Sequence, residues 1–220
     1  MAQTPELIKL SPSKLGSFLE CPACFWRDYH GKSPPSFPPA GILNRMDRLT
    51  KEYYDKFRNK IPPILKGKIS EKLVDRGTAE KLRTYMKYFD EELNIELKGK
   101  MDDCFIDEKG KLVPMDNKTA SPGNEDMLKM YQLQLDAYTF LLQKNGFETA
   151  NYGYLVYYVA ESGDPENGIV FKAEAKKLEM HPEKILKLIK DAAEILRKPS
   201  PPKSHGDCEM CEWMKHFEEL

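Results

Sequence analysis

The chain has 220 residues, of which 40% are hydrophobic and 31% are charged, a size and composition typical of one well-packed globular domain. It contains no run of eighteen apolar residues, and its first residues lack the basic start and apolar stretch of a secretory signal, so we expect a cytoplasmic protein without a membrane span. The formal net charge of −1 disfavours a protein that coats nucleic acid non-specifically, but it is compatible with an enzyme that concentrates positive charge in a groove.

The first part of the sequence predicts three helices, with proline-rich loops at residues 33–39 and 61–63. Ser11 and Pro12 favour the start of the first helix, because serine accepts hydrogen bonds at an N-cap and proline is tolerated at the first helical position. Apolar residues at helical spacing predict a second helix, and a third is predicted over residues 71–91. The residues expected to be buried are Ile42, Met46, Leu49, Tyr53 and Phe57 in the second helix, and Leu73, Leu82, Tyr85, Met86 and Phe89 in the third.

The second part of the sequence predicts strands alternating with helices. Residues 95–106 and 112–115 predict two or three strands with a turn at residues 107–110, and residues 152–160 and 170–175 predict two more with a turn at residues 161–168. The predicted helices cover residues 127–143, with Met130 among the buried residues, and 182–197. This order predicts an α/β domain built around a mixed sheet.

The predicted hairpin around residues 107–110 carries a group of charged side chains. Its two strands bring Asp102 and Asp116 near each other across a ladder. Asp116 and Lys118 project from the same side, because side chains alternate along a strand. Two carboxylates and one ammonium group are therefore expected to converge on one spot.

Such a group can support hydrolysis of a phosphodiester. Carboxylate ligands with open water positions suit Mg²⁺ or Mn²⁺, and such an ion polarises a phosphate and lowers the pKa of bound water. A lysine two residues from a ligand can orient that water and offset charge that builds on the phosphate. The alternative interpretation is a surface hairpin with solvated charges, because Asp-x-Lys by itself is a weak motif.

The next predicted helix adds a third motif. It places Gln134 and Tyr138 one turn apart on one face, although an ordinary helix face could also carry these residues. With Gly99-x-x-Asp102 and Asp116-x-Lys118 before it, the series resembles the RecB-type branch of the PD-(D/E)XK nuclease superfamily. The resemblance implies a restriction-endonuclease-like fold, in which helices flank a mixed central sheet, and a metal-dependent nuclease activity.

The resemblance also implies a role for each residue of the three motifs. Asp102 and Asp116 would hold the metal ion, together with the backbone carbonyl of Asn117. Lys118 would position the attacking water. Gln134 and Tyr138 would steady the site or the DNA strand.

One feature of the family pattern is missing. Many members carry a histidine ligand on the first core helix, but the corresponding residues 41–47 contain none. Asn44 and Asp47 are the candidate replacements, and the alternative is a site without this ligand. A degenerate, less active site therefore stays among the hypotheses.

Four of the five cysteines form two Cys-x-x-Cys pairs near the ends of the chain. The pairs are Cys21 with Cys24 and Cys208 with Cys211. In a reducing cytosol such pairs more often bind metal than form disulfides, and four thiolates suit an iron–sulfur cluster or tetrahedral zinc. Unliganded thiols are the remaining alternative. Cys104 has no partner in the sequence and is expected to be a small core residue.

The split between the two ends of the chain is similar to that of the iron–sulfur nucleases of CRISPR adaptation and of AddB-like exonucleases. There, cysteines from both ends join around one four-iron four-sulfur cluster, which the resemblance implies here, with Zn²⁺ as the alternative. The two-and-two division departs from their usual one and three. The resemblance implies a single nuclease domain over residues 1–220, with residues 1–40 and 199–220 forming a cysteine-ligated clamp.

Three classes of function are compatible with these features. The leading hypothesis is a Mg²⁺- or Mn²⁺-dependent DNA exonuclease or DNA-end-processing nuclease that acts on single- or double-stranded ends. A catalytically degenerate DNA-end-binding or structural module of the same fold is the main alternative. A zinc-stabilised protein-interaction domain is the third, and it would make the hairpin motif accidental.

Overall fold

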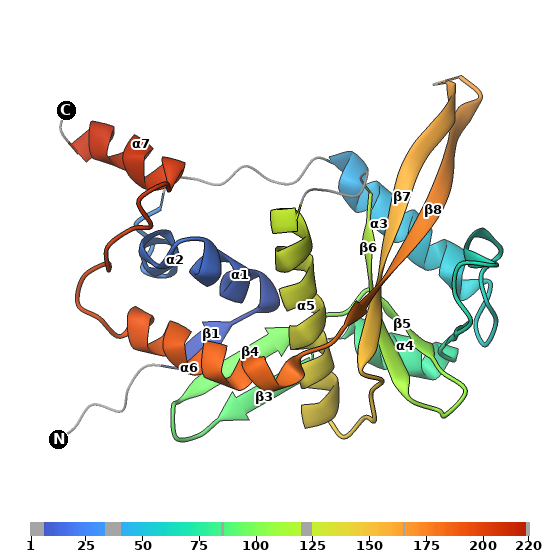
Figure 1. Ribbon diagram of the computed structural model, residues 1–220, viewed down its shortest axis with the longest axis horizontal. Helices are drawn as coiled ribbons and strands as arrows, with labels where there is room; N and C mark the ends of the chain where they lie inside the picture. The colour runs from blue at the N-terminus through green and yellow to red at the C-terminus, as the bar shows by residue number, and fades with distance from the viewer. Residues whose placement is uncertain (1–6, 34–40, 85, 120–124, 165, 219–220) are drawn as a thin grey trace. The chain divides into compact units, whose positions relative to one another are not determined.

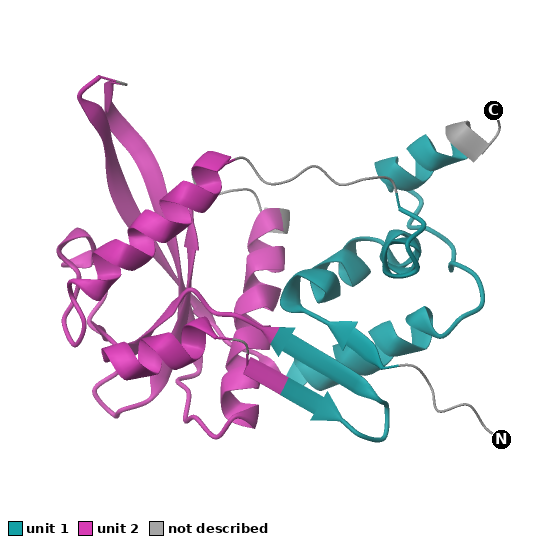
Figure 2. Ribbon diagram, turned by 180° about the vertical axis from the view of Figure 1, so that it is seen from behind, with its two compact units in different colours: residues 1–37, 88–98, 183–220 teal, residues 38–87, 99–182 magenta. Residues whose placement is uncertain are grey.

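The computed structural model describes residues 7–33, 41–84, 86–119, 125–164 and 166–218 (Figure 1). The chain divides into two compact units (Figure 2). The terminal unit consists of Met1–Phe37, Tyr88–Lys98 and Glu183–Leu220, and the central unit of Pro38–Lys87 and Gly99–Pro182. Among the described residues, no helix has the length and apolar character needed to cross a membrane.

The central unit is built on a five-stranded mixed sheet in the order β2-β5-β6-β7-β8. Neighbouring strands are antiparallel except β6 and β7, which run parallel. The strands are β2 (Lys72–Leu73), β5 (Asp103–Ile106), β6 (Leu112–Lys118), β7 (Tyr152–Asp164) and β8 (Gly168–Glu179). With the helices described below, this sheet confirms the predicted α/β fold class.

The hairpin of β5 and β6 has the predicted turn at residues 107–110. The Asp107 carboxylate accepts hydrogen bonds from the backbone N–H groups of Lys109 and Lys111, at 2.9 and 2.8 Å. Gly110 has a φ of 77°, a conformation that glycine adopts without steric cost. The turn fixes the register of the ladder, in which Asp103 pairs with Met115.

Helices cover both faces of this sheet. They are α3 (Gly41–Asp55), η1 (Pro63–Leu65), α4 (Arg76–Arg83) and α5 (Glu125–Lys144). Odd-numbered residues of β6, such as Met115, share a buried cluster with Tyr54 of α3. Asp116 points the other way and contacts Gln134 of α5. The alternation of side chains along β6 therefore separates an apolar face from a polar one.

The terminal unit combines a small sheet with four helices. Its sheet has the order β1-β4-β3, with β1 parallel to β4. The elements are β1 (Ile8–Leu10), α1 (Pro12–Glu20), α2 (Pro22–Tyr29), β3 (Met86–Asp90), β4 (Ile95–Gly99), η2 (Pro182–Lys184), α6 (Ile185–Leu196) and α7 (Glu209–Glu218), of which β3, β4 and η2 extend into the central unit. Ser11 caps α1 as predicted, because its side chain accepts a hydrogen bond from the N–H of Lys14. Ile185, Ile189 and Leu196 form part of the buried face of α6.

The predicted helix over residues 71–91 is wrong, because the segment forms β2, α4 and β3 instead. Leu73 pairs with Phe105 of β5, which extends the backbone at the start of the segment. Asp75 then caps α4 by accepting a hydrogen bond from the N–H of Thr78 at 3.0 Å. Tertiary pairing and this cap leave only a short helix, so the periodicity of the segment was misleading.

Several predictions of burial also need correction. Leu73, Leu82 and Met86 are buried as expected, but Phe89 is 50% exposed. Tyr85 lies outside the described residues, as does most of the proline-rich loop at residues 33–39. In α3 the residues Thr50 and Tyr54 are buried, whereas Ile42 and Leu49 are exposed. Tyr53 and Phe57 are partly buried against the same core cluster as Tyr54, as predicted, so the prediction fails only toward the start of the helix. Met130 of α5, also predicted to be buried, is exposed.

The strands β7 and β8 are longer than predicted. Their pairing continues to Asp164 and Gly168, through most of the segment expected to be a polar turn at residues 161–168. Once a hairpin ladder is established, each further antiparallel pair adds hydrogen bonds whether or not the side chains are apolar. Composition alone therefore placed the end of these strands too early.

A buried ion-pair network holds α3, α4 and β5 together. Asp103 of β5 is 0% exposed. Its carboxylate accepts hydrogen bonds from the guanidinium groups of Arg58 at 2.5 and 2.7 Å and of Arg83 at 2.9 Å. Both arginines also donate hydrogen bonds to Asp55.

The same network affects the ionisation of Asp55. Burial opposes the charge of this carboxyl, but Arg83 and Arg58 outweigh the effect of burial and hold the pKa of Asp55 below its usual value. This contribution to stability is present above the unfolded-state pKa and is lost as the pH falls through the folded-state pKa.

We predict that Asp103→Ala strongly destabilises the protein. The change leaves two arginines without their buried partner, and breaking a buried pair in this way costs about 3–5 kcal/mol. Urea unfolding followed by circular dichroism would measure the free energy of unfolding. The matched control is Asp191→Ala, which removes an exposed ion pair with Lys187 and should cost less than about 1 kcal/mol. Equal effects of the two changes would contradict a structural role of the Asp103 network.

Candidate active site and cysteine cluster

The two predicted acidic residues lie across the β5–β6 ladder. Asp103 pairs with Met115, so Asp102 and Asp116 are the next positions along the same register. The Asp102 carboxylate accepts a hydrogen bond from the backbone N–H of Asn117 at 3.4 Å. Asp116 is 3% exposed, whereas Asp102 is only partly buried. The pair therefore joins a buried carboxylate to one that solvent can reach.

Lys118 lies against Asp116, as the alternation of the strand predicts. Its Nζ atom is 2.5 Å from Oδ2 of Asp116 and donates a hydrogen bond to Oε1 of Gln134 at 3.0 Å. It also lies over the ring of Tyr131, 4.1 Å from the centroid. These contacts fix the ammonium group between β6 and α5.

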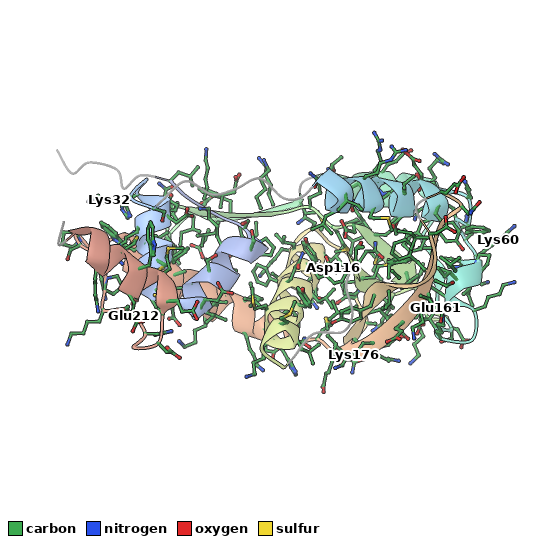
Figure 3. All side chains as sticks on the ribbon, turned by 90° about the horizontal axis from the view of Figure 1, so that it is seen from above. Lys32, Lys60, Asp116, Glu161, Lys176 and Glu212 are labelled. Atoms are coloured by element: carbon green, nitrogen blue, oxygen red, sulfur yellow. The ribbon has the colours of Figure 1, made fainter. Side chains whose placement is uncertain are left out.

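Helix α5 supplies the remaining polar groups of the cluster. The Nε2 atom of Gln134 donates to Oδ1 of Asp116 at 3.1 Å and lies 3.0 Å from the hydroxyl of Tyr138 (Figure 3 labels Asp116 beside this helix). Gln134 thus contacts Asp116, Lys118 and Tyr138 with one amide. The structure brings these four predicted residues together.

The electrostatic environment of Asp116 favours a bound cation. Burial raises the pKa of Asp116 to about 6, and Asp102 adds to this effect while Lys118 opposes it. Oδ2 of Asp116 is buried and, among the described residues, it has an ion pair with the Lys118 ammonium at 2.5 Å but no further donor. A divalent ion bound by Asp102 and Asp116 would add a second cation beside this carboxylate and favour its charged form. The donor set of hard carboxylate oxygens therefore fits Mg²⁺ or Mn²⁺.

Asn117 directs its side chain to the other face of the sheet. Its Oδ1 atom accepts a hydrogen bond from the hydroxyl of Tyr54 at 3.2 Å, and this hydroxyl bonds in turn to that of Tyr158. The backbone of Asn117, in contrast, bonds to Asp102. The side chain of Asn117 thus points away from the site, which leaves its backbone carbonyl as the candidate metal ligand that the resemblance implied.

Lys51 of α3 is a further charged residue at this site that the sequence analysis missed. Its Nζ atom is 3.0 Å from Oδ1 of Asp102 and 2.6 Å from Oδ1 of Asp47. Burial opposes its charge, but Asp102 and Asp47 together raise the pKa of Lys51. Asp47 and Lys51 are four residues apart, a spacing that could have indicated a paired helix face. Of the two candidates for the missing histidine, Asp47 reaches the site through Lys51, whereas Asn44 is exposed.

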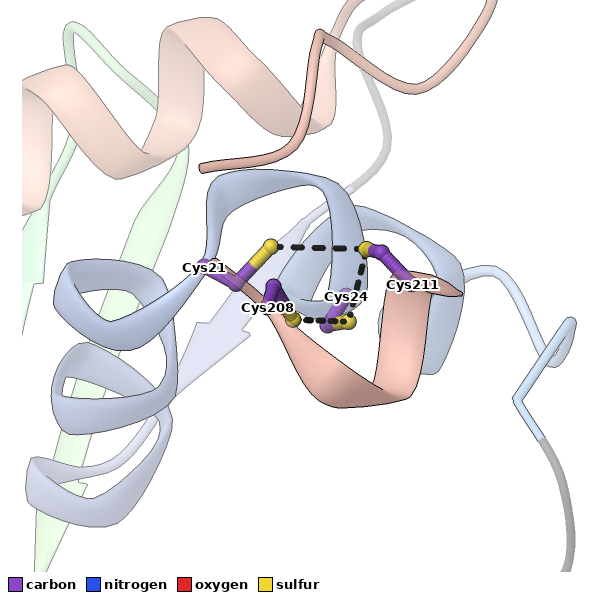
Figure 4. A group of neighbouring side chains, drawn as sticks. All are labelled: Cys21, Cys24, Cys208 and Cys211. Atoms are coloured by element: carbon purple, nitrogen blue, oxygen red, sulfur yellow. Dashed lines mark hydrogen bonds between the residues drawn. The ribbon is translucent and has the colours of Figure 1, made fainter. Parts of the chain in front are cut away.

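The four terminal cysteines meet in the terminal unit (Figure 4). Cys21 lies at the start of α2 and Cys24 within it, whereas Cys208 precedes α7 and Cys211 lies in its first turn. The Sγ atoms are 3.6 Å apart for Cys21 and Cys211, 3.6 Å for Cys24 and Cys208, and 3.3 Å for Cys24 and Cys211. All four lie within 4.8 Å of one another. The prediction that the two ends of the chain join at these cysteines is confirmed.

The thiols influence one another's ionisation. Burial opposes the charge of Cys21, but contacts with the backbone at Cys24 and His205 and with other thiols lower its pKa to about 6. Burial and the neighbouring thiols raise the pKa of Cys24. The Arg27 guanidinium donates to Sγ of Cys211 at 3.4 Å. A cation in the centre would allow all four groups to be thiolates, so the donor set fits a thiophilic metal.

Other side chains around the cluster are structural. The indole N–H of Trp26 donates to the carbonyl of Lys198 at 2.9 Å, and the ring of His205 bonds to the carbonyl of Glu20 at 2.8 Å. Both contacts tie the N-terminal segment to the C-terminal one. In the central unit, the fifth cysteine, Cys104, is buried and its thiol donates to the carbonyl of Val113, which confirms the prediction of a core residue.

The chain was compared with solved structures, curated proteins and protein-family models. The chain is similar to a crystal structure of SSO0001, with 17% identity over 91% of this chain and 81% of that chain, at a TM-score of 0.47. A search of curated proteins gave no match. The family model of the PD-(D/E)XK nuclease superfamily matches residues 43–215, which include the Asp102–Asp116–Lys118 cluster and the second cysteine pair. The chain therefore belongs to the PD-(D/E)XK nuclease superfamily.

Proposed function

We propose that this protein is a Mg²⁺- or Mn²⁺-dependent deoxyribonuclease of the RecB type, an exonuclease or DNA-end-processing enzyme. The observation that carries the proposal is the buried Oδ2 atom of Asp116, which lacks a hydrogen-bond donor among the described residues and faces the ammonium group of Lys118. Membership of the nuclease superfamily supports phosphodiester hydrolysis as the reaction. The order of the Gly99, Asp116 and Gln134 motifs supports the RecB-type assignment.

In this proposal each polar residue has a defined task. Asp102 and Asp116 hold the divalent ion, which when bound polarises the phosphate and acidifies water. Lys118 orients the attacking water and balances charge that develops on the phosphate. Gln134 keeps the Lys118 ammonium and the Asp116 carboxylate at a fixed separation through its two hydrogen bonds. Burial raises the pKa of Tyr138, so its hydroxyl stays protonated, and its oxygen accepts a hydrogen bond from Gln134.

A hollow lined by lysines supports a polyanionic substrate. It lies in the central unit and has a volume of about 570 Å³. Lys56, Lys60, Lys66 and Lys72 line it, around an apolar floor that includes Phe57. These four lysines are exposed and form no ion pair with any described residue. Clustered unpaired lysines attract phosphate groups despite the nearly neutral total charge of the chain.

The cysteine cluster is proposed to hold one structural metal centre. In a tetrahedral zinc site with Zn–S bonds of about 2.3 Å, the sulfur atoms lie about 3.8 Å apart. The separations of 3.3 and 3.6 Å are close to this value. In a four-iron four-sulfur cluster each thiolate binds a different iron, so the sulfurs must lie farther apart. The spacing therefore favours Zn²⁺ over the iron–sulfur cluster that the resemblance to CRISPR-adaptation nucleases implied.

The extent of the nuclease domain stays a prediction. A single domain over residues 1–220, with residues 1–40 and 199–220 as the cysteine clamp, is compatible with the family match, which extends from the central unit into the second cysteine pair. Because neither cysteine pair completes a four-thiolate shell by itself, metal binding would be coupled to folding of the terminal unit.

We predict that Lys118→Ala reduces DNA cleavage about a hundredfold to a thousandfold, the usual cost of removing one preorganised electrostatic contact. DNA binding and the circular dichroism spectrum should be unchanged, and added Mn²⁺ should not restore cleavage.

Asp116→Ala should be equally inactive, but because the metal affinity is lost. High Mn²⁺ should then partly restore cleavage, provided that Asp102 still holds the ion. Lys109→Ala, in the turn of the same hairpin, is the control and should cut normally.

The same assay separates the two leading classes of function. Cleavage of labelled single- and double-stranded DNA by the unaltered protein with Mg²⁺ or Mn²⁺ is expected. DNA binding without any cleavage would favour the catalytically degenerate DNA-end-binding module.

We predict about one zinc ion per chain and no visible absorbance in protein purified without oxygen. Elemental analysis and absorption spectroscopy measure both quantities. Cys24→Ser should release the metal and lower the melting temperature, because metal binding and folding are coupled. Cys104→Ser is the matched control and should keep the metal. Iron and sulfide with a visible absorbance band would establish the cluster instead.

We predict that Lys60→Ala with Lys72→Ala lowers the salt dependence of DNA binding. Each lost phosphate contact reduces the slope of log K against log salt by about 0.9 for duplex DNA or about 0.7 for a single strand, so the double variant should lose about 1.8 or about 1.4 units. Fluorescence anisotropy over a range of salt concentrations measures the slope. Lys81→Ala with Lys109→Ala removes the same charge away from the hollow. Equal changes in both double variants would show a general charge effect and no contact at the hollow.

A further inference from the structure

Lys51 is shared between two carboxylates at the edge of the candidate metal site. Its Nζ atom contacts Oδ1 of Asp102 at 3.0 Å, and Oδ1 and Oδ2 of Asp47 at 2.6 and 2.8 Å. Its side chain is only 20% exposed. Lys118 already neutralises Asp116, so the proposed hydrolysis assigns no task to this second ammonium group.

The backbone around Lys51 is held in place from both sides. Arg83 donates hydrogen bonds to the carbonyl of Lys51 and to that of Asp102, both at 3.4 Å. The guanidinium group therefore links helix α3 to the start of β5. Because Arg83 links the two backbones, the flexible side chain of Lys51 is the part of this contact that can most readily change its position.

We propose that Lys51 is an internal counter-ion that a divalent metal displaces from Asp102, and that Asp47 retains the displaced ammonium group. The proposal rests on the proposed function, in which Asp102 is a metal ligand. Lys51 then acts as a positioning residue, which controls how readily the site takes up its metal.

The charges around the site explain why such an exchange is needed. Asp102 and Asp116 repel each other, and Lys51 beside Asp102 offsets this repulsion when no metal is bound. A divalent ion and an ammonium group cannot both contact Oδ1 of Asp102 closely, because like charges repel at short distance. An ion that binds Oδ1 of Asp102 must therefore displace Lys51.

Asp47 makes the displacement inexpensive in free energy. Both of its carboxylate oxygens already lie within hydrogen-bond distance of Lys51, so the ammonium group keeps a partner after it leaves Asp102. After the exchange the three carboxylates face two ammonium groups and one divalent ion, which gives the region a net positive charge. A net positive charge favours binding of a phosphodiester anion.

The affinity of the full-length protein for Mn²⁺, measured by titration calorimetry with the cysteine site loaded, tests the proposal without an activity assay. Lys51→Met keeps the apolar stem and removes the charge, so it should bind Mn²⁺ about tenfold more tightly, which corresponds to one removed repulsion. Arg48→Met is the control, because Arg48 lies on the same helix but pairs with Glu52. Its Mn²⁺ affinity should be unchanged.

Asp47→Asn provides an independent arm. Without the Asp47 charge, Lys51 should hold Asp102 more tightly, so Mn²⁺ should bind several-fold more weakly. In the Lys51→Met background the same change should have a smaller effect, because most of its action passes through Lys51. Equal effects of Asp47→Asn in both backgrounds would overturn the proposed coupling.

The outcomes separate this proposal from the proposed function. Weaker or unchanged Mn²⁺ binding by folded Lys51→Met would overturn the exchange, since a purely structural ion pair predicts that result. Asp116→Ala tests the metal site itself and should weaken Mn²⁺ binding strongly. If Asp116→Ala binds Mn²⁺ normally, the metal site and the nuclease function fail together. If Asp116→Ala loses the metal while Lys51→Met is unchanged, only the role of Lys51 is refuted.

Discussion

Burial of carboxylates in the β5–β6 hairpin is the constraint on which the central unit depends. Asp103 and Asp116 are both almost inaccessible to solvent. A buried charge is costly unless it is paired and hydrogen-bonded, so each carboxylate dictates which helices must pack nearby. Asp103 requires the arginines that follow α3 and end α4, and Asp116 requires Gln134 of α5.

Because side chains alternate along a strand, the structural carboxylate Asp103 and the candidate metal ligand Asp116 lie on opposite faces of the sheet. Asp103 shares the face of Met115 and Tyr54, and its oxygens are fully engaged by two guanidinium groups. Asp116 faces the other way and keeps one oxygen without a donor among the described residues. A saturated carboxylate stabilises the fold, whereas an unsaturated one can accept a metal ion. Two neighbouring residue pairs of the β5–β6 ladder therefore differ in role: the Asp103–Met115 pair stabilises the fold, and the Asp102–Asp116 pair forms the candidate metal site.

The terminal unit is stabilised on a different principle. Its N- and C-terminal segments are joined by the cysteine cluster and by the Trp26 and His205 contacts with backbone carbonyls. Helix α2 is also anchored by the buried Ala23, Phe25 and Trp26, and the metal centre proposed above would add to this apolar packing. The superfamily match begins only at residue 43 and leaves out the first cysteine pair, whose contact with the second pair was predicted from the sequence and is shown by the tertiary structure.

The sequence by itself determined the features that depend on local physics. The Asp107–Gly110 turn, the alternation that aligns Asp116 with Lys118, and the one-turn spacing of Gln134 and Tyr138 all follow from short-range geometry. The tertiary structure decided the features that depend on distant partners. Residues 71–91 are not one helix, because Leu73 pairs with Phe105. Lys51 belongs to the candidate site because the packing of α3 brings it to Asp102, and no local pattern encodes a contact between a helix and a strand so far apart in the chain.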